Sequence, residues 1–363
     1  MEAAPSKTAT LLIPFVGKTK LFKPLTYKSS VASDRLQIRP LLKALEDLNF
    51  DVTALSLNIN HSLEELELIK PTDLCIVSKI RAHPEVDEEK FTYFHTCCVL
   101  KMKRLGAKIL TIYSDNVCNA QNTDGELYRS LLFLSDTIVT PSKKLSAYAN
   151  THANPTSTIF TISDPNQLKK QQFRRIEKNQ PIKLIWFGNF SNLKYLKKAL
   201  GSLTKKLTLF KNINLQIVTS MPGIEYMKKE LTPFSIRSNW TIELIEWDIK
   251  DQPRQLESLL NASHIALIPS DPNDPTKDGV SHNRLVDSIQ SGCISIASPV
   301  DSYCELSKIA LIGNNFSDLI NKAILENNRL CAKYEVLRDE QLRRFNPAVI
   351  HSAWTQAIKQ SFS

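Results

Sequence analysis

The stretch PSDPNDPTKDGVSHNRLVDSIQSGCISIASPVDSYCEL, residues 269–306, determines how the rest of the chain can be interpreted. It follows the apolar run His264–Pro269, which has the length and β-branched content of a buried strand. A loop rich in Pro, Asp and Asn comes next, and Ser281 is the expected N-cap of a helix that ends at Gly292. Residues Cys293–Ala297 then form a second strand. This order predicts one unit of a parallel α/β sheet, with its polar loop at the carboxyl edge where such folds bind ligands.

The residue types in this loop indicate a ligand that carries phosphate. Lys277 supplies a mobile positive charge, and Gly279 allows the backbone to approach a ligand closely. Ser281, His282 and Asn283 lie where the free N–H groups of a helix N-terminus would face an anion.

The second half of the stretch resembles the donor-binding segment of a known family. Asp287 stands five residues before Gly292, and Tyr303, Glu305 and Leu306 resemble the family's later Y-x-E-L loop. The family is the GT-B type of glycosyltransferase, in its family 1/4-like group. The resemblance implies an α/β fold with two Rossmann-like domains facing across a cleft.

A subgroup of this family has a Lys followed by Ser-x-Asn-Arg, and the order of Lys277, Ser281, Asn283 and Arg284 is close to it. The resemblance implies that Lys277 and the nearby helix N–H groups stabilise the departing diphosphate. Arg284 would add charge or brace the loop, and Asp287 would bind the ribose hydroxyls. We therefore expect the Lys277→Ala and Asp287→Ala variants to lose activity without losing thermal stability.

A second turn supports the same assignment. The predicted strand Ile182–Phe187 turns at Gly188–Asn192 into a helix, which is a ready anion site. Trp247 follows a later strand and is either a contact of the nucleotide base or a core residue. The donor-binding residues implied by the resemblance are Gly188, Asn189, Asn192, Lys194, Trp247, Ser281, His282, Asn283, Arg284, Asp287, Tyr303 and Glu305.

The first half of the chain provides candidates for the acceptor side. Asp115 follows the predicted strand Lys108–Tyr113 and resembles the first acid of the family's D-x-x-D stretch, so with Lys277 it is a predicted catalytic residue. Arg35, near the start of a helix, and Lys79, at a strand end, are predicted to face the acceptor. The loop Gly17–Ser33 is basic and aromatic, and it could hold an acceptor or be a solvated loop.

Composition sets the broad class of the protein. The 363 residues suffice for two domains, and the net charge of +9 is spread over both halves, so no nucleic-acid partner is expected. The seven cysteines are an odd number without a C-x-x-C pair, which favours a reducing compartment and gives no metal motif. We expect a cytoplasmic protein without a cofactor, and contact with a membrane surface is a second possibility.

These observations predict a layout and a function. The layout is a first domain at 1–165, a linker at 166–180, a donor domain at 181–345 and a closing helix at 346–363 that crosses back to the first domain. The predicted function is hexosyl transfer from a nucleotide sugar to a glycan, lipid or small molecule in the cleft, and a glycan acceptor would indicate polysaccharide biosynthesis. The alternative is a non-catalytic relative that binds nucleotide or sugar, because Gly279 replaces a family glutamate and Asn189 a family arginine.

Overall fold

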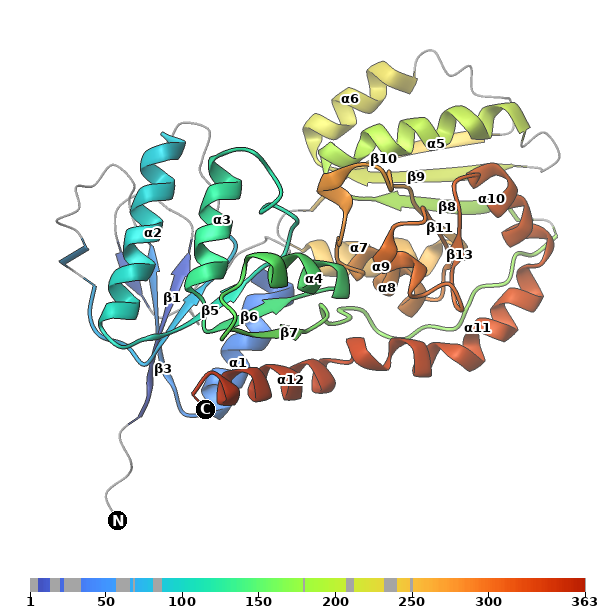
Figure 1. Ribbon diagram of the computed structural model, residues 1–363. Coiled ribbons are helices and arrows are strands. Elements are labelled where there is room, and N and C mark those ends of the chain that lie inside the picture. The colour runs from blue at the N-terminus through green and yellow to red at the C-terminus, as the bar shows by residue number, and fades with distance from the viewer. Residues whose placement is uncertain are drawn as a thin grey trace. The chain divides into compact units, whose positions relative to one another are not determined.

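The chain forms two compact units, each built around its own sheet (Figure 1). The computed structural model describes residues 6–13, 20–22, 34–56, 66–67, 69–80, 87–178, 180–206, 212–231, 240–248 and 251–362. The first unit contains residues 1–165, 278–281 and 347–363, and the second contains 166–277 and 282–346. Most of the predicted basic loop 17–33 lies outside the described residues.

The first unit contains a sheet of seven strands within the described part of the chain, in the order β2-β3-β1-β4-β5-β6-β7. The strands are β1 (Thr8–Ile13), β2 (Lys20–Phe22), β3 (Asp51–Ser56), β4 (Leu74–Val77), β5 (Lys108–Ile112), β6 (Thr137–Thr140) and β7 (Thr158–Thr161). Only β2, among these strands, is antiparallel to its neighbour, with Lys20 opposite Ser56. Three residues that the sequence predicted as loop therefore form a short edge strand.

The helices of the first unit include one from the far end of the chain. They are η2 (Asp34–Ile38), α1 (Arg39–Asp47), α2 (Glu88–Arg104), α3 (Thr123–Leu134), α4 (Lys143–His152) and α12 (Pro347–Gln360). Residues Asp34–Ile38 are wound as a π-turn, and α1 begins next to Pro40, which has no N–H for an intrahelical bond. Trp354 and Ile358 of α12 are buried in the core with Leu41 and Leu45 of α1.

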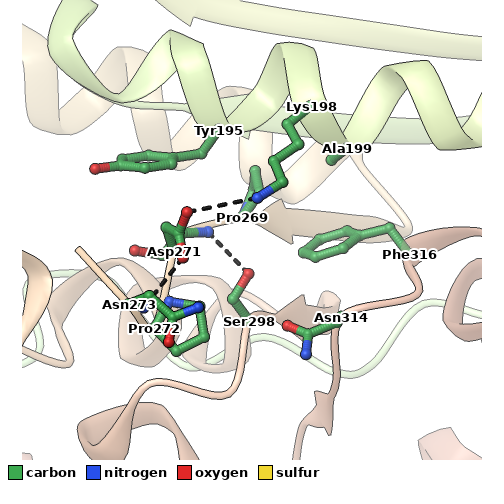
Figure 2. Close-up of a pocket in the computed structure, with 11 residues that line it drawn as sticks. Tyr195, Lys198, Ala199, Pro269, Asp271, Pro272, Asn273, Ser298, Asn314 and Phe316 are labelled. Atoms are coloured by element: carbon green, nitrogen blue, oxygen red, sulfur yellow. Dashed lines mark hydrogen bonds and ion pairs between the residues drawn. The ribbon is translucent and has the colours of Figure 1, made fainter.

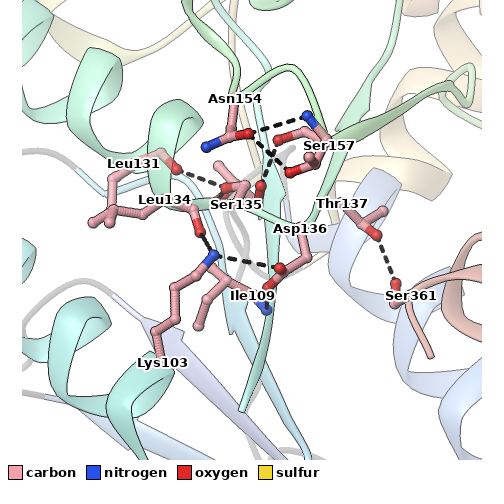
Figure 3. Close-up of polar contacts among 12 residues, drawn as sticks. Lys103, Ile109, Leu131, Leu134, Ser135, Asp136, Thr137, Asn154, Ser157 and Ser361 are labelled. Atoms are coloured by element: carbon pink, nitrogen blue, oxygen red, sulfur yellow. Dashed lines mark hydrogen bonds and ion pairs between the residues drawn. The ribbon is translucent and has the colours of Figure 1, made fainter. Parts of the chain in front are cut away.

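Polar contacts join strands of the first sheet to these helices (Figure 3). The Asp136 carboxylate accepts the Ile109 N–H at 2.8 Å, which fixes the start of β6 beside β5. The Thr137 and Ser361 hydroxyls are 2.8 Å apart, so the end of the chain is attached to this sheet. Residues 347–362 thus belong to the first unit through both packing and hydrogen bonding.

The second unit has six strands within the described residues, in the order β10-β9-β8-β11-β12-β13, and their pairings are parallel. The strands are β8 (Ile182–Phe187), β9 (Ile213–Thr219), β10 (Trp240–Glu246), β11 (Ile265–Ile268), β12 (Ile294–Ala297) and β13 (Leu311–Ile312). Numbered along the unit, this is the order 3-2-1-4-5-6 of a Rossmann sheet. Strand order reverses between β8 and β11, and the crevice at such a point is where these sheets bind ligands.

Helices cover both faces of the second sheet, with α5 and α6 on one face and α7, α8 and α9 on the other (Figure 1). The helical segments are η4 (Phe190–Asn192), α5 (Leu193–Lys206), α6 (Met221–Leu231), α7 (Gln252–Ala262), η5 (Pro275–Lys277), α8 (Asn283–Gln290), α9 (Asp301–Cys304), α10 (Phe316–Leu325), α11 (Asn327–Leu342) and η6 (Arg343–Phe345). The helix α10 packs against α5. No helix in the described part of the chain has both the length and the apolar character needed to cross a membrane.

Residues 166–178, which the sequence analysis interpreted as a linker, pack on the second unit without forming a helix or strand. The Arg174 guanidinium donates to the carbonyl oxygens of Leu260, Ser263 and Ser291, the last at 2.6 Å. Gly292, with φ at +76°, lies against Gln172, where a Cβ would be 2.1 Å from the carbonyl oxygen. This segment is therefore a fixed part of the second unit.

Candidate functional site

Two loops flank the point where strand order reverses in the second sheet. One is the turn that begins at Gly188 after β8, and the other is the loop 269–282 between β11 and α8. Both leave the carboxyl ends of their strands, so they meet at the same edge of the sheet. The structure thus brings together the two segments for which the sequence predicted phosphate binding.

Gly188 of the first segment lies against Arg284, in the helix that follows the second segment. A Cβ added to Gly188 would lie 3.3 Å from Nη1 of Arg284 and 3.2 Å from the Trp186 ring, so a side chain here would crowd the guanidinium. Nη2 of Arg284 is 3.3 Å from the Tyr303 hydroxyl, while Nη1 is buried without a hydrogen-bond partner among the described residues. A buried guanidinium N–H without an acceptor is costly, and an anionic oxygen at this position would satisfy it.

Asp274 fixes the loop to helix α5. Its carboxylate accepts hydrogen bonds from the Lys194 ammonium at 3.1 Å and from the Tyr195 hydroxyl. The Thr276 N–H and hydroxyl donate to the other oxygen at 2.9 and 2.7 Å. Burial alone would raise the pKa of Asp274, but these hydrogen bonds outweigh it and lower that pKa far below its ordinary value.

Lys277 is positioned by the same carboxylate residue. Its backbone N–H donates to the Asp274 carbonyl oxygen at 2.8 Å, and its Nζ lies 5.6 Å from the centre of the Tyr195 ring. The Lys194 ammonium is 4.8 Å from the same ring centre. Lys194, a predicted donor-binding residue, and Lys277, a predicted catalytic residue, therefore both lie over the ring of Tyr195. The sequence analysis did not identify this tyrosine.

The N-terminus of α8 is arranged differently from the expectation. The N-cap position is held by His282, which makes no side-chain capping bond, and the Asn283 side chain accepts the Arg284 N–H at 2.7 Å. The hydroxyl of Ser281, the predicted cap, donates instead to Asp164. The prediction of Ser281 as N-cap was wrong, because the helix begins one residue later, with His282 at the N-cap position.

A cluster of His282, Glu305 and Arg344 lies beside this helix start. The Glu305 carboxylate is 2.5 Å from the Arg344 guanidinium and 3.4 Å from Nε2 of His282. Arg344 is also 3.0 Å from that imidazole nitrogen, and the His282 ring packs on Phe345. His282 and Arg344 lower the pKa of Glu305 to about 2. Glu305, a predicted donor contact, is therefore held by an arginine that the sequence analysis did not select.

Asp287 has structural partners within the protein. Its side chain is 3% exposed, and it accepts the Gln167 backbone N–H at 3.2 Å and the Gln167 amide at 3.4 Å. A ribose contact stays a prediction. The expectation that Asp287→Ala would leave thermal stability unchanged does not fit this burial, because the variant would leave the Gln167 N–H without its acceptor.

The remaining predicted donor residues are distributed around the same edge. Asn189 is exposed at the start of η4, and Asn192 is half-buried at its end. Trp247 donates its backbone N–H to Thr219 at 2.9 Å and packs against the cluster that contains Leu260. This packing favours the core alternative for Trp247 over contact with a base.

The predicted acceptor-side residues lie in the first unit. Lys79 and Asp115, which follow the neighbouring strands β4 and β5, form an ion pair, and about a third of each side chain is exposed. Arg35 lies in η2, next to Gln37 in that helical turn. Gln37 links the Ser114 hydroxyl at 2.6 Å to the Asp164 carboxylate at 3.1 Å. Of the predicted acceptor-side and catalytic residues, Lys79 and Asp115 are thus brought together at the carboxyl edge of the first sheet.

Gly279 packs against helix α4. Its φ is +77°, and a Cβ would lie 2.7 Å from Cγ of Leu145 on α4. Its carbonyl oxygen accepts the Ser142 hydroxyl at 2.8 Å, and the Asp278 carboxylate accepts the Tyr148 hydroxyl. The missing side chain therefore gives room to helix α4, while a close approach of a ligand to this backbone stays a prediction.

Comparisons with known proteins identify the fold. No family model matches the chain, and no curated protein matches it in sequence. Among solved structures, HepE of Anabaena in complex with UDP-glucose is 9% identical, with a TM-score of 0.64 over 97% of this chain and 99% of that one. Sucrose-phosphate synthase from Thermosynechococcus elongatus is 10% identical, with a TM-score of 0.66 over 98% and 99% of the two chains.

A glycosyltransferase from Rickettsia africae is 12% identical, with a TM-score of 0.66 over 99% of this chain and 100% of that chain. These similarities extend over nearly the full length of each protein, so both sheets and their connections correspond. The chain has the GT-B fold of these glycosyltransferases.

Proposed function

We propose that this chain is a glycosyltransferase that takes a hexosyl group from a nucleoside diphosphate sugar. The observation that carries the proposal is the buried, unpartnered Nη1 of Arg284 beside Gly188, at the reversal point of the second sheet. Lys194 and Lys277 lie on the same two segments and contact one tyrosine. Three cations at the place where Rossmann sheets bind ligands suit a diphosphate.

In the proposed reaction the bond between the anomeric carbon and the diphosphate oxygen breaks, and a bond to the acceptor oxygen forms. The electron pair of the broken bond remains on the diphosphate, whose growing charge Lys277 and Arg284 stabilise. One well-placed donor of this kind contributes about 3 to 4 kcal/mol to catalysis. If the configuration at the anomeric carbon is inverted, Asp115 accepts the proton of the acceptor hydroxyl, and its ion pair with Lys79 orients the carboxylate.

The identity of the donor is a further part of the proposal. HepE has been solved with UDP-glucose and with UDP and glucose, and its fold matches over nearly the full chain. This supports a UDP-sugar as the first donor to test. The acceptor would be a hydroxyl compound such as a glycan, with a lipid or small molecule as the alternatives.

A second candidate is a GT-B relative that binds nucleotide or sugar without catalysis. The observation that favours it is the Lys79–Asp115 ion pair, because the carboxylate that would serve as the base is already engaged by an ammonium group of the same unit. Release of nucleotide from a sugar nucleotide distinguishes the two candidates, because only the enzyme would catalyse it.

The test is a thermal-shift panel of UDP, GDP, ADP, CMP and their sugars, followed by release of nucleotide from the best donor. A ligand at about 100 times its dissociation constant adds about 2.7 kcal/mol of stability. We expect one sugar nucleotide to stabilise the protein and to be hydrolysed slowly in water. EDTA should not change this rate, because the sequence gives no metal motif. Stabilisation without turnover would support the binding protein, and the absence of stabilisation by any nucleotide would contradict both candidates.

A further inference from the structure

A pocket of about 310 Å³ lies in the second unit, on the side of β11 that faces β12 and β13 (Figure 2). Helix α5 forms one wall through Lys198, and Phe316 at the start of α10 forms another. Asp271 and Ser298 contribute from the segments that follow β11 and β12. The volume is near the lower end of the roughly 300 to 1,000 Å³ that is usual for small-molecule sites, so the pocket suits a small ligand.

None of the residues that line this pocket is among the predicted donor contacts. Tyr195 is the connection between the two places, because its ring lines the pocket and its hydroxyl donates to Asp274. The pocket is therefore a separate space that shares one wall residue with the loop of Lys277.

Charges in the pocket balance one another. The Lys198 ammonium is 3.5 Å from the Asp271 carboxylate, and both line the same space (Figure 2). A phosphate or carboxylate ligand would meet the Asp271 oxygens, and a cation would meet the lysine. This pairing favours a ligand without net charge.

Uncharged polar groups complete the lining. The Ser298 hydroxyl oxygen accepts the Ser270 N–H at 2.9 Å and can still donate its own proton. The Ser270 hydroxyl is buried and makes no hydrogen bond to the described residues. The side-chain amides of Asn273 and Asn314 likewise have no hydrogen bond to side chains or backbone in the described part of the chain. These groups offer donors and acceptors together, which is what hydroxyl groups require.

Two aromatic rings lie in the wall of the same pocket. Tyr195 is 5% exposed and Phe316 is 2% exposed, so each ring is held by packing and is not free to rotate into solvent. Aromatic walls combined with neutral hydrogen-bonding groups fit a ring that has apolar faces and a hydroxylated rim. We infer that this pocket binds an uncharged monosaccharide unit, at a site separate from the diphosphate site.

The test measures binding of glucose, galactose, mannose and N-acetylglucosamine to the full chain by saturation-transfer difference NMR and calorimetry. We expect at least one of these sugars to bind, and the Asn314→Ala variant to weaken that binding about tenfold, as the loss of one hydrogen bond of about 1.4 kcal/mol predicts. Lys198→Met should weaken it as well. Asn328→Ala, on the exposed side of α11, is the matched control and should bind as the unchanged protein does.

Failure of this inference is distinguishable from failure of the proposed transferase. Lys277→Ala should leave sugar binding unchanged, and sugar binding should persist whether or not any nucleotide sugar is turned over. If none of the four sugars binds, or if Asn314→Ala and Lys198→Met bind the sugar as well as Asn328→Ala does, the inference is wrong. Binding of inorganic phosphate or uridine that responds to these two variants, in place of sugar binding, would also overturn it.

Discussion

The carboxyl edges of the two sheets carry opposite kinds of chemistry. In the first unit, the described edge at β4 and β5 has one acid, Asp115, paired with Lys79. In the second unit, Lys194, Lys277 and Arg284 gather at the edge, and the Asp274 carboxylate joins the loop of Lys277 to helix α5. The difference fits the proposal, in which the second unit would bind the anionic diphosphate and Asp115 of the first unit would accept the proton.

The largest expected effect tests the first edge. Asp115→Asn removes the proposed base without changing the size of the side chain, and we expect transfer to fall by about 10² to 10⁴. The affinity for nucleotide should not change, because the residue belongs to the other unit. Steady-state transfer and calorimetry on the same preparations measure the two quantities.

The matched control for this variant is Asp339→Asn, which also breaks an acid–lysine pair, with Lys170, away from both edges. If transfer activity falls equally in the two variants, the loss is not specific to Asp115. A fall in nucleotide affinity with Asp115→Asn would contradict the division of chemistry between the two edges.

The next effect tests the second edge. Lys277→Ala removes a cation from the proposed diphosphate site, and we expect kcat/KM to fall by about 10² to 10³. The melting temperature should change little, because the side chain contacts the face of one ring and is partly exposed. Lys333→Ala, an exposed lysine that also lies over a tyrosine ring, is the control. Normal turnover in Lys277→Ala would remove this lysine from the site.

A smaller effect tests whether Asp287, near the second edge, binds the ligand or stabilises the fold. Asp287→Ala removes a buried carboxylate and leaves the Gln167 N–H without its acceptor, and we expect the free energy of unfolding to fall by about 1 to 3 kcal/mol. Urea unfolding measures this change. If Asp287→Ala is as stable as the unchanged protein but loses nucleotide affinity, the ribose contact predicted from the sequence is correct and the structural role is wrong.

The smallest expected effect is a dependence of stability on pH. His282 and Arg344 lower the folded-state pKa of Glu305 to about 2, whereas the ordinary value is 4.5. The ion pair therefore stabilises the fold above about pH 4.5, and this contribution is lost as pH falls from 4.5 toward 2. Glu305→Gln should be less stable near pH 7 and should show a flatter stability profile below pH 4.5. An unchanged profile would contradict the pairing.

Local signals allowed much of the fold to be predicted. Apolar runs of four to six residues marked β8, β11 and β12. Gly292 ends α8 with a positive φ, as expected for a glycine after a helix. These features depend on residues close in sequence, so a single chain suffices to reveal them.

The sequence analysis missed the hydrogen bonds and ion pairs between side chains that are far apart in the chain. Asp274 in a Pro-rich loop gave no sign of its bond to Tyr195, 79 residues earlier, and Ser281 none of its bond to Asp164, 117 residues earlier. Arg344 lies in a charged segment where any of several basic residues could have reached Glu305. Such pairs arise from packing between segments that periodicity and spacing do not connect.

The central claim is that Lys277 and Arg284 of the second unit bind a nucleoside diphosphate. Its most direct test compares the affinities of a nucleoside, its monophosphate and its diphosphate by calorimetry. If Lys277 and Arg284 bind the second phosphate, the diphosphate should bind at least about tenfold more tightly than the monophosphate, a difference of about 1.4 kcal/mol. In Lys277→Ala this difference should largely disappear, while nucleoside affinity is unchanged. Equal affinities for monophosphate and diphosphate in the unchanged protein would contradict the account.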